Sequence, residues 1–94
     1  GAKGVISVLS NVRPKRTLQM VRACQAGDYA AAGRMQVALT PLIDALFSEI
    51  NPIPVKQALS LMGIPAGLPR LPLTPLSATH LPALEQALSA APEP

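Results

Sequence analysis

The chain has 94 residues, of which 49% are apolar and 14% charged, and its net charge is +3. This length allows one small domain or part of a larger one, and it excludes a complete (β/α)8 barrel, which needs about 250 residues. Average proteins carry roughly 25% charged residues, so this chain has too little charge to cover its own surface, and we expect part of that surface to pack against other structure. One tyrosine and one phenylalanine are too few for a platform that stacks nucleic-acid bases.

The cysteine content and the hydropathy pattern indicate the compartment. A single cysteine, Cys24, makes no intrachain disulfide and no multi-cysteine zinc site. No signal segment opens the chain, and no apolar run reaches the roughly 18 residues that suggest a membrane span. We therefore expect a cytoplasmic protein with no nucleic-acid partner, no membrane partner and no cofactor.

The first segment, Gly4–Val8, is a short β-branched run that follows a glycine, and it predicts one buried strand. No other segment of the chain has this pattern. A lone strand cannot satisfy its own backbone N–H and C=O groups. Either its partner strands lie outside these residues, or the segment is not a strand.

A helix is expected next. Pro14 suits the first turn of this helix, and Gly27 suits the position just after its end. Between them, Leu18, Val21 and Cys24 recur at helical spacing and predict an apolar stripe that faces the core. This places Cys24 among the buried, inert thiols rather than the reactive ones.

The longest periodic segment runs from Tyr29 to about Phe47, and Asp28 should cap its start. Pro41 lies inside it and predicts a kink in one bent helix, with two helices meeting at Thr40 as the alternative. The apolar positions at spacings of three and four are Ala32, Met35, Leu39, Leu42, Ile43 and Leu46.

Prolines and glycines divide the rest of the chain. Pro54 can open a third helix that Gly63 ends. Residues 64–76 contain four prolines and predict an extended, fixed connector. We expect its leucines to face inward; they are Leu68, Leu71 and Leu73.

Pro82 constrains the last helix, because a proline is tolerated only in the first turn. That helix should therefore begin near Ser77 or Thr79. Its predicted apolar stripe consists of Leu81, Leu84 and Leu88.

The residue types that carry chemistry are few and scattered. The only histidine, His80, lies near a helix start and has no neighbouring ligand or base partner, so we expect a surface residue. No two carboxylates are spaced for acid–base catalysis. The cations Arg13, Lys15 and Arg16 predict a solvated helix start, with an anion or nucleic-acid contact as the alternative. These residues alone do not indicate a self-sufficient enzyme.

Three motifs carry a family resemblance. They are residues 1–8 with Asn11-Val12, then Asn51–Lys56, then Arg70–Ser77. In this order and at these distances they resemble the C-terminal third of the dihydrodipicolinate synthases. Those enzymes belong to the family of pyruvate-dependent class I aldolases that also includes N-acetylneuraminate lyase.

The resemblance implies an α/β fold, in which a (β/α)8 barrel is followed by a C-terminal helical extension. Residues 1–27 would be the last βα unit of the barrel, with 4–8 as its last strand. Residues 28–94 would be the extension, so that this part of the protein is itself mostly helical. The partner strands missing from the sequence would then belong to the preceding part of the barrel.

The resemblance also implies a reaction. The family's synthases condense pyruvate with L-aspartate 4-semialdehyde through a lysine Schiff base to give 4-hydroxy-tetrahydrodipicolinate, a precursor of diaminopimelate and lysine. The Schiff-base lysine would lie before Gly1, so no catalytic residue falls in this segment. Only Ile6 would reach the site, where its backbone carbonyl lies beside pyruvate. The intact protein would be a homo-oligomer, either a dimer or a tetramer.

Two alternatives remain from the sequence. One is another aldolase of the same family, such as a sialate lyase; Val8 argues against it, because an apolar side chain offers no hydrogen bond to a sugar hydroxyl. The other is a non-catalytic helical binding module. In the favoured hypothesis, the segment supplies a pocket wall and packing rather than the nucleophile.

Overall fold

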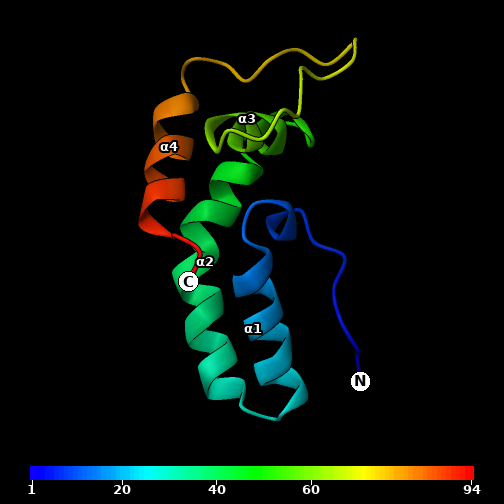
Figure 1. Cartoon of the computed structure of the whole chain (residues 1–94), viewed down its shortest axis with the longest axis vertical. Coiled ribbons are helices and arrows are strands. Elements are labelled where there is room, and N and C mark those ends of the chain that lie inside the picture. The colour runs from blue at the N-terminus through cyan, green and yellow to red at the C-terminus, as the bar shows by residue number, and fades with distance from the viewer.

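A computed structural model describes the whole chain, residues 1–94, as a short 3-10 turn and four α-helices. The turn η1 spans Leu9–Asn11, and the helices are α1 (Pro14–Gln25), α2 (Tyr29–Leu46), α3 (Ile53–Leu61) and α4 (Leu81–Ala90). In Figure 1, α1 runs antiparallel to the lower half of α2, while α3 and α4 lie against its upper half. The molecule is elongated, with extents of 42 × 24 × 21 Å.

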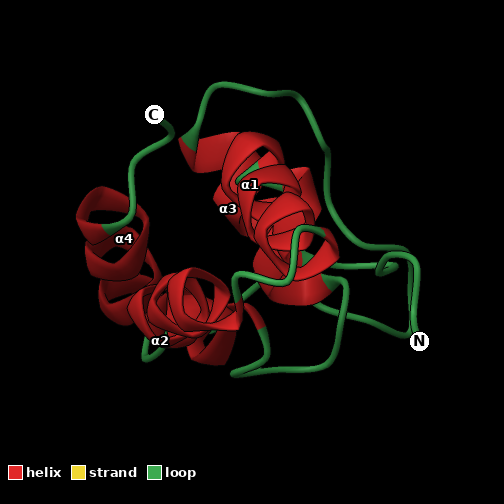
Figure 2. Ribbon diagram, turned by 90° about the horizontal axis from the view of Figure 1, so that it is seen from below, coloured by secondary structure: helices red, strands yellow, loops and turns green.

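Residues 1–7 form no strand, and Figure 2 contains only helices and loops. The strand predicted over residues 4–8 is therefore absent. Its backbone has no neighbouring strand to pair with, and unpaired N–H and C=O groups turn to water instead. The segment runs beside α1, where the Gln25 side chain donates to the Lys3 carbonyl at 2.9 Å.

The predicted boundary between the first two helices is confirmed. The first residue of α1 is Pro14, and Gly27 follows its end with a φ of +80°, a backbone conformation that favours glycine. The Asp28 carboxylate accepts from the backbone N–H of Ala31 at 2.9 Å and so caps α2.

The second helix is continuous through Pro41, which excludes two helices meeting at Thr40. Proline has no N–H, so the carbonyl of Val37 loses its helical partner. Both residues are exposed, and water can satisfy that carbonyl. The helix therefore tolerates the proline because its position is on the solvent side.

The last two helices also follow their prolines. Pro54 is in the first turn of α3, and Gly63 follows its end with a φ of +79°. The last helix begins at Leu81, later than the predicted start at Ser77 or Thr79. Residues 78–80 form turns instead, and Pro82 then occupies the first turn of α4, where its missing N–H costs nothing.

The apolar core lies between η1, α2, α3 and α4. Among the predicted positions it includes Leu39, Leu42 and Leu46 of α2 and Leu84 and Leu88 of α4. Met35 and Leu81, also predicted, are only half-buried, while η1 and the chain end add further residues. The buried residues of this cluster are Leu9, Val12, Leu39, Leu42, Ala45, Leu46, Val55, Ala58, Leu84, Ala87, Leu88 and Ala91.

Two sets of predicted core residues are exposed. On α1, Leu18 is 47% exposed, and Cys24 is exposed rather than buried. The only buried residue of α1 is Thr17, because this helix packs on α2 and η1 but not on α3 or α4, and its apolar stripe faces away from the core. In the connector, Leu68 and Leu71 are also exposed, the latter by 88%, since the loop projects beyond α3 (Figure 1).

Candidate functional site

The segment that should reach the substrate pocket is open to solvent. Ile6 is fully exposed, at 106%, and its carbonyl accepts no hydrogen bond. The turn after it is held by its own polar groups: Asn11 donates to the Val8 carbonyl from its side chain at 3.0 Å and from its backbone at 3.1 Å. The Ser10 hydroxyl donates to the Ser7 carbonyl at 2.6 Å. The unpaired carbonyl of Ile6 is therefore followed directly by a hydrogen-bonded turn over residues 7–11.

Arg13, which follows this turn, is buried, with 6% of its surface exposed. Its guanidinium donates to the carbonyls of Leu88 at 2.7 Å, Val12 at 2.6 Å and Ala91. Burial lowers the pKa of Arg13, and the nearby Glu93 carboxylate opposes that shift. The predicted solvated helix start is therefore wrong for this residue, whose partners lie at the other end of the sequence.

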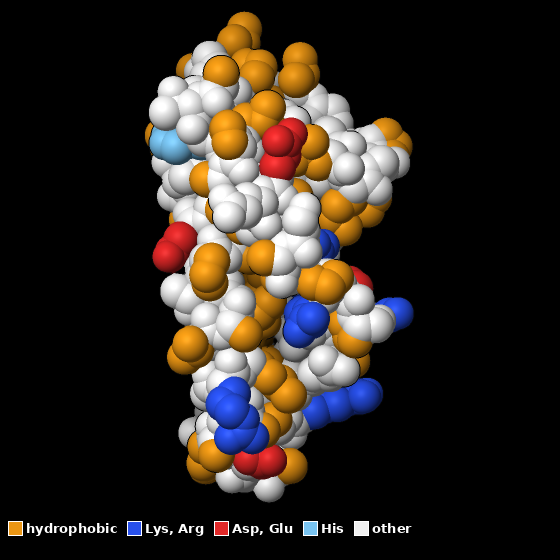
Figure 3. Space-filling view, turned by 90° about the vertical axis from the view of Figure 1, so that its left-hand side faces the viewer, with side chains coloured by type: hydrophobic (Ala, Val, Ile, Leu, Met, Phe, Trp, Pro, Cys, Tyr) orange, Lys and Arg blue, Asp and Glu red, His pale blue; other side chains and the backbone are white.

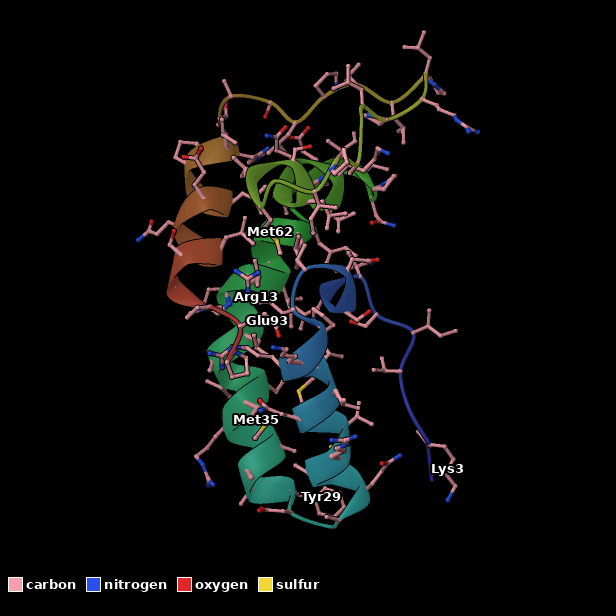
Figure 4. The ribbon with its side chains drawn as sticks, viewed as in Figure 1. Lys3, Arg13, Tyr29, Met35, Met62 and Glu93 are labelled. Atoms are coloured by element: carbon pink, nitrogen blue, oxygen red, sulfur yellow. The ribbon has the colours of Figure 1, made fainter.

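The end of the chain crosses the start of α1. The Arg16 side chain donates to the Pro92 carbonyl at 2.5 Å, and the backbone N–H of Lys15 donates to a Glu93 carboxylate oxygen at 3.1 Å. Figure 4 shows Glu93 next to Arg13 where the chain end passes this helix. Two of the three predicted surface cations therefore bind the chain's own C-terminal segment, while the Lys15 side chain is exposed.

Neither remaining lysine has the surroundings of a Schiff-base nucleophile. The Lys56 ammonium donates to the Ala66 carbonyl at 2.6 Å and ties the connector to α3. Lys3 is exposed near the open end of the molecule (Figure 4). A lysine nucleophile needs a desolvated pocket or a neighbouring cation, and neither residue has a closed apolar pocket around it.

His80 lies at the start of α4, as predicted, but it has a partner that the sequence did not indicate. Its Nδ1 lies 2.7 Å from a Glu49 carboxylate oxygen, and that oxygen also accepts from the Ser77 backbone at 3.0 Å and hydroxyl at 2.9 Å. These hydrogen bonds lower the pKa of Glu49, the one from His80 most strongly.

The cluster of Glu49, Ser77 and His80 has the geometry of a structural contact and not of a catalytic triad. The Ser77 hydroxyl and the Glu49 carboxylate both meet the same His80 nitrogen, Nδ1, at 3.1 and 2.7 Å. A catalytic triad needs the nucleophile on one ring nitrogen and the carboxylate on the other. The cluster instead fixes the start of α4 to the loop that follows α2. Glu49 and His80 are 31 positions apart, so no local pattern could have found their contact.

An apolar groove of about 580 Å³ lies between residues 1–5 and the two helices α1 and α2. Met20, Val21 and Cys24 line it from α1, and Ala32 lines it from α2. No acid or histidine lines it, so the groove resembles an uncovered packing face more than a reaction site. The apolar stripe that was predicted to be buried is therefore present and uncovered.

Two smaller pockets lie elsewhere, one beside Lys56 and Gly67 and one beside Met62 and Glu85. Figure 3 shows apolar side chains spread over a whole face of the molecule, with Lys and Arg side chains in its lower half. No three histidine, cysteine, aspartate or glutamate side chains come together as metal ligands. None of the helices has the length and apolar character needed to cross a membrane.

Comparison with known proteins supplies the context for these features. The family described as the Dihydrodipicolinate synthetase family matches residues 1–91. The 4-hydroxy-tetrahydrodipicolinate synthase of an Exiguobacterium species is 53% identical over 92% of this chain and 31% of its own length. The enzyme of the same name from Methanocaldococcus jannaschii is 49% identical over 94% of this chain and 30% of its own length.

The fold agrees with the sequence match. The crystal structure of dihydrodipicolinate synthase from Thermotoga maritima superposes with a TM-score of 0.89 at 43% identity, and the overlap covers 95% of this chain and 30% of that one. The chain thus spans about 30% of the length of the relatives it matches. The family match includes all three sequence motifs, from the segment around Ile6 to Ser77. The chain belongs to the dihydrodipicolinate synthetase family.

Proposed function

We propose that these residues form the C-terminal part of a lyase that condenses pyruvate with L-aspartate 4-semialdehyde through a lysine Schiff base. The product would be 4-hydroxy-tetrahydrodipicolinate, on the route to diaminopimelate and lysine. The family match over residues 1–91 carries this proposal. The relatives are about three times as long as the matched part, so the reaction belongs to a longer polypeptide.

In that polypeptide, residues 1–27 would be the last βα unit of a (β/α)8 barrel and 28–94 its helical extension. Two features support this division. Residues 4–6 leave their backbone groups unpaired, as a strand does when its neighbours are missing. The groove along α1 exposes an apolar stripe that a barrel would cover. The helices would then serve as packing behind the barrel.

The Ile6 carbonyl would form part of the pyruvate pocket. Barrel enzymes place their sites at the C-terminal ends of the strands, and Ile6 lies near the end of the proposed strand. Its carbonyl is unpaired, whereas those of Ser7 and Val8 are occupied by the following turn. The Ile6 carbonyl is thus the unpaired carbonyl nearest to the turn, and it is the one that would face the substrate.

Trapping of the Schiff base tests the proposal. We expect pyruvate and borohydride to leave a covalent adduct on one lysine of the full-length protein and none on the 94-residue chain. Borohydride without pyruvate is the control. An adduct on Lys3 or Lys56, or no adduct on the full-length protein, would contradict the assignment.

Further properties follow from the same assignment. We place the full-length enzyme in the cytoplasm, because the one cysteine of this segment forms no disulfide within it, as is usual in a reducing compartment. We expect it to form a homo-oligomer, since exposed leucines such as Leu68 and Leu71 remain beyond the apolar groove. Light scattering on the full-length protein measures its oligomeric state, and a monomer would contradict this expectation.

A further inference from the structure

The start of α1 and the end of α4 each receive a polar side chain from the other's end of the chain. The N-terminus of α1 has no side-chain cap of its own, and the carboxylate of Glu93 accepts from the Lys15 backbone N–H at 3.1 Å there. At the C-terminus of α4, the Arg13 guanidinium donates to the carbonyls of Leu88 and Ala91. A carboxylate at a helix N-terminus and a cation at a C-terminus are each favoured by the helix dipole. We call this pair of contacts the Arg13–Glu93 latch.

The latch joins parts that otherwise do not touch. The last helix packs on α2 and α3 but not on α1, and Figure 2 shows α4 set apart at the left while α1 lies nearer the middle. Only the latch and the bond from Arg16 to Pro92 connect them. The other Glu93 oxygen is buried without a hydrogen-bond partner, so the carboxylate is held in place by the Lys15 N–H and the charge of Arg13.

The latch also reaches the turn that precedes α1. The backbone N–H of Arg13 donates to the Leu9 carbonyl at 2.9 Å, and that of Val12 donates to the same carbonyl at 3.0 Å. Val12 is fully buried, so this stretch cannot move without disturbing the core. Arg13 therefore links η1, which begins three residues after Ile6, to α4: its backbone bonds the turn and its guanidinium bonds the end of the helix.

We propose that Arg13 is a positioning residue for the pyruvate site. Through the latch it holds residues 6–12 in a fixed place against the helical extension, and so it fixes the Ile6 carbonyl. This inference rests on the proposed function, because the role of that carbonyl does. It predicts that loss of the guanidinium weakens the binding of pyruvate more than the binding of the aldehyde substrate.

The test compares Arg13→Met with the matched control Arg34→Met in the full-length enzyme. Methionine keeps an unbranched apolar stem and removes the charge; Arg34 is an exposed arginine of α2 that makes no hydrogen bond to another side chain or carbonyl. We expect Arg13→Met to raise the KM for pyruvate about 10-fold, while the KM for the semialdehyde and kcat change less than about 3-fold. Arg34→Met should leave all three constants unchanged.

Hydrogen exchange provides a second measurement that does not depend on activity. Well below the melting temperature, the amides of residues 7–12 should exchange faster in Arg13→Met than in wild type, and Arg34→Met should not change them. A lower melting temperature with an unchanged KM for pyruvate would overturn the inference, as would unchanged exchange. If Arg13→Met does not fold, Glu93→Gln replaces it, with the same pattern expected at about a 3-fold increase in KM.

The two proposals fail in different ways. If the wild-type enzyme forms no pyruvate adduct, the proposed function is wrong, and the positioning role in pyruvate binding is wrong with it. If the adduct forms and the Arg13→Met kinetics match wild type, only the inference about the latch is wrong. The exchange data then decide whether the latch orders the turn at all.

Discussion

The two halves of the molecule differ in how they bury their apolar residues. The half formed by α3, α4 and the end of α2 encloses a core in which Leu46 and Leu84 are completely buried. The half formed by α1, the start of α2 and residues 1–5 leaves its apolar stripe along an open groove. The first half buries its apolar side chains within the chain, whereas the second leaves them exposed to solvent. Membership of a family of longer proteins explains the difference, since the missing partner would be the rest of the barrel.

The largest effect should come from the closed half. Leu46→Ala removes a fully buried side chain and leaves a cavity, so we expect the free energy of unfolding to fall by about 2–5 kcal/mol. Urea denaturation of the full-length protein measures this change. A loss below about 1 kcal/mol would mean that the core near the end of α2 is looser than the structure indicates.

The open half should respond differently in the two lengths of the protein. Leu18 is 47% exposed here, so Leu18→Ala should change the stability of the 94-residue chain by less than about 0.5 kcal/mol. In the full-length protein the barrel would cover this residue, and we expect a loss of about 2 kcal/mol. Equal effects in the two proteins would show that the stripe on α1 is not the docking face. The same denaturation experiment measures both values.

The boundary between α1 and α2, within the open half, should show a smaller effect. Asp28→Ala removes the acceptor for the Ala31 N–H at the start of α2, so we expect a loss of about 1 kcal/mol. Asp28→Asn, which keeps a capping oxygen, is the control and should be nearly neutral. Thermal melts of the two variants separate the cap from a general effect of charge; similar losses in both would argue against the cap.

Most of the helical architecture could be predicted from the sequence, because its signals are local. Pro14, Gly27 and Asp28 fix a helix start, a stop and a cap within a few residues of each other. The spacing of Leu39, Leu42 and Leu46 is likewise a property of one helix. Such features depend on neighbours along the chain, and the structure confirms them.

The errors share a different cause. The stripe of Leu18 and Cys24 was correctly identified as apolar but wrongly assigned to the core, since no other part of this chain covers it. The strand over 4–8 is absent because no neighbouring strand of this chain pairs with it; under the proposed function, the rest of the barrel would supply both the cover and the pairing. The burial of Arg13 was missed because its acceptors are 75–78 positions away in the sequence. A single sequence contains no spacing signal for contacts of that range.

The candidate site depended less on pattern than on resemblance. The spacing of Gly4–Val8 indicated a strand, but no local rule assigns the Ile6 carbonyl to a pyruvate pocket. The structure adds that this carbonyl is unpaired and that a self-bonded turn follows it. Only the family motifs connect that geometry to a reaction.

The smallest predicted effect concerns the Glu49–His80 contact, which fixes the start of α4 in the closed half. The hydrogen bonds from His80 and Ser77 lower the pKa of Glu49 in the folded protein below its usual value of 4.5. A carboxyl group with a lowered folded pKa stabilises the protein above its unfolded pKa, and this contribution is lost as the pH falls through the folded value. Glu49 therefore makes the protein less stable as the pH falls below about 4.5.

Glu49→Gln removes this titration. We expect wild type to have the higher melting temperature at pH 6 and the difference to shrink as the pH falls below 4.5, because protonated Glu49 no longer accepts a charge-assisted hydrogen bond from His80. Glu85→Gln, at an exposed position of α4, is the matched control and should follow the wild-type curve. A constant difference between wild type and Glu49→Gln from pH 6 to pH 3 would show that the contact contributes through shape and not through charge. The start of α4 would then be held by the apolar core alone.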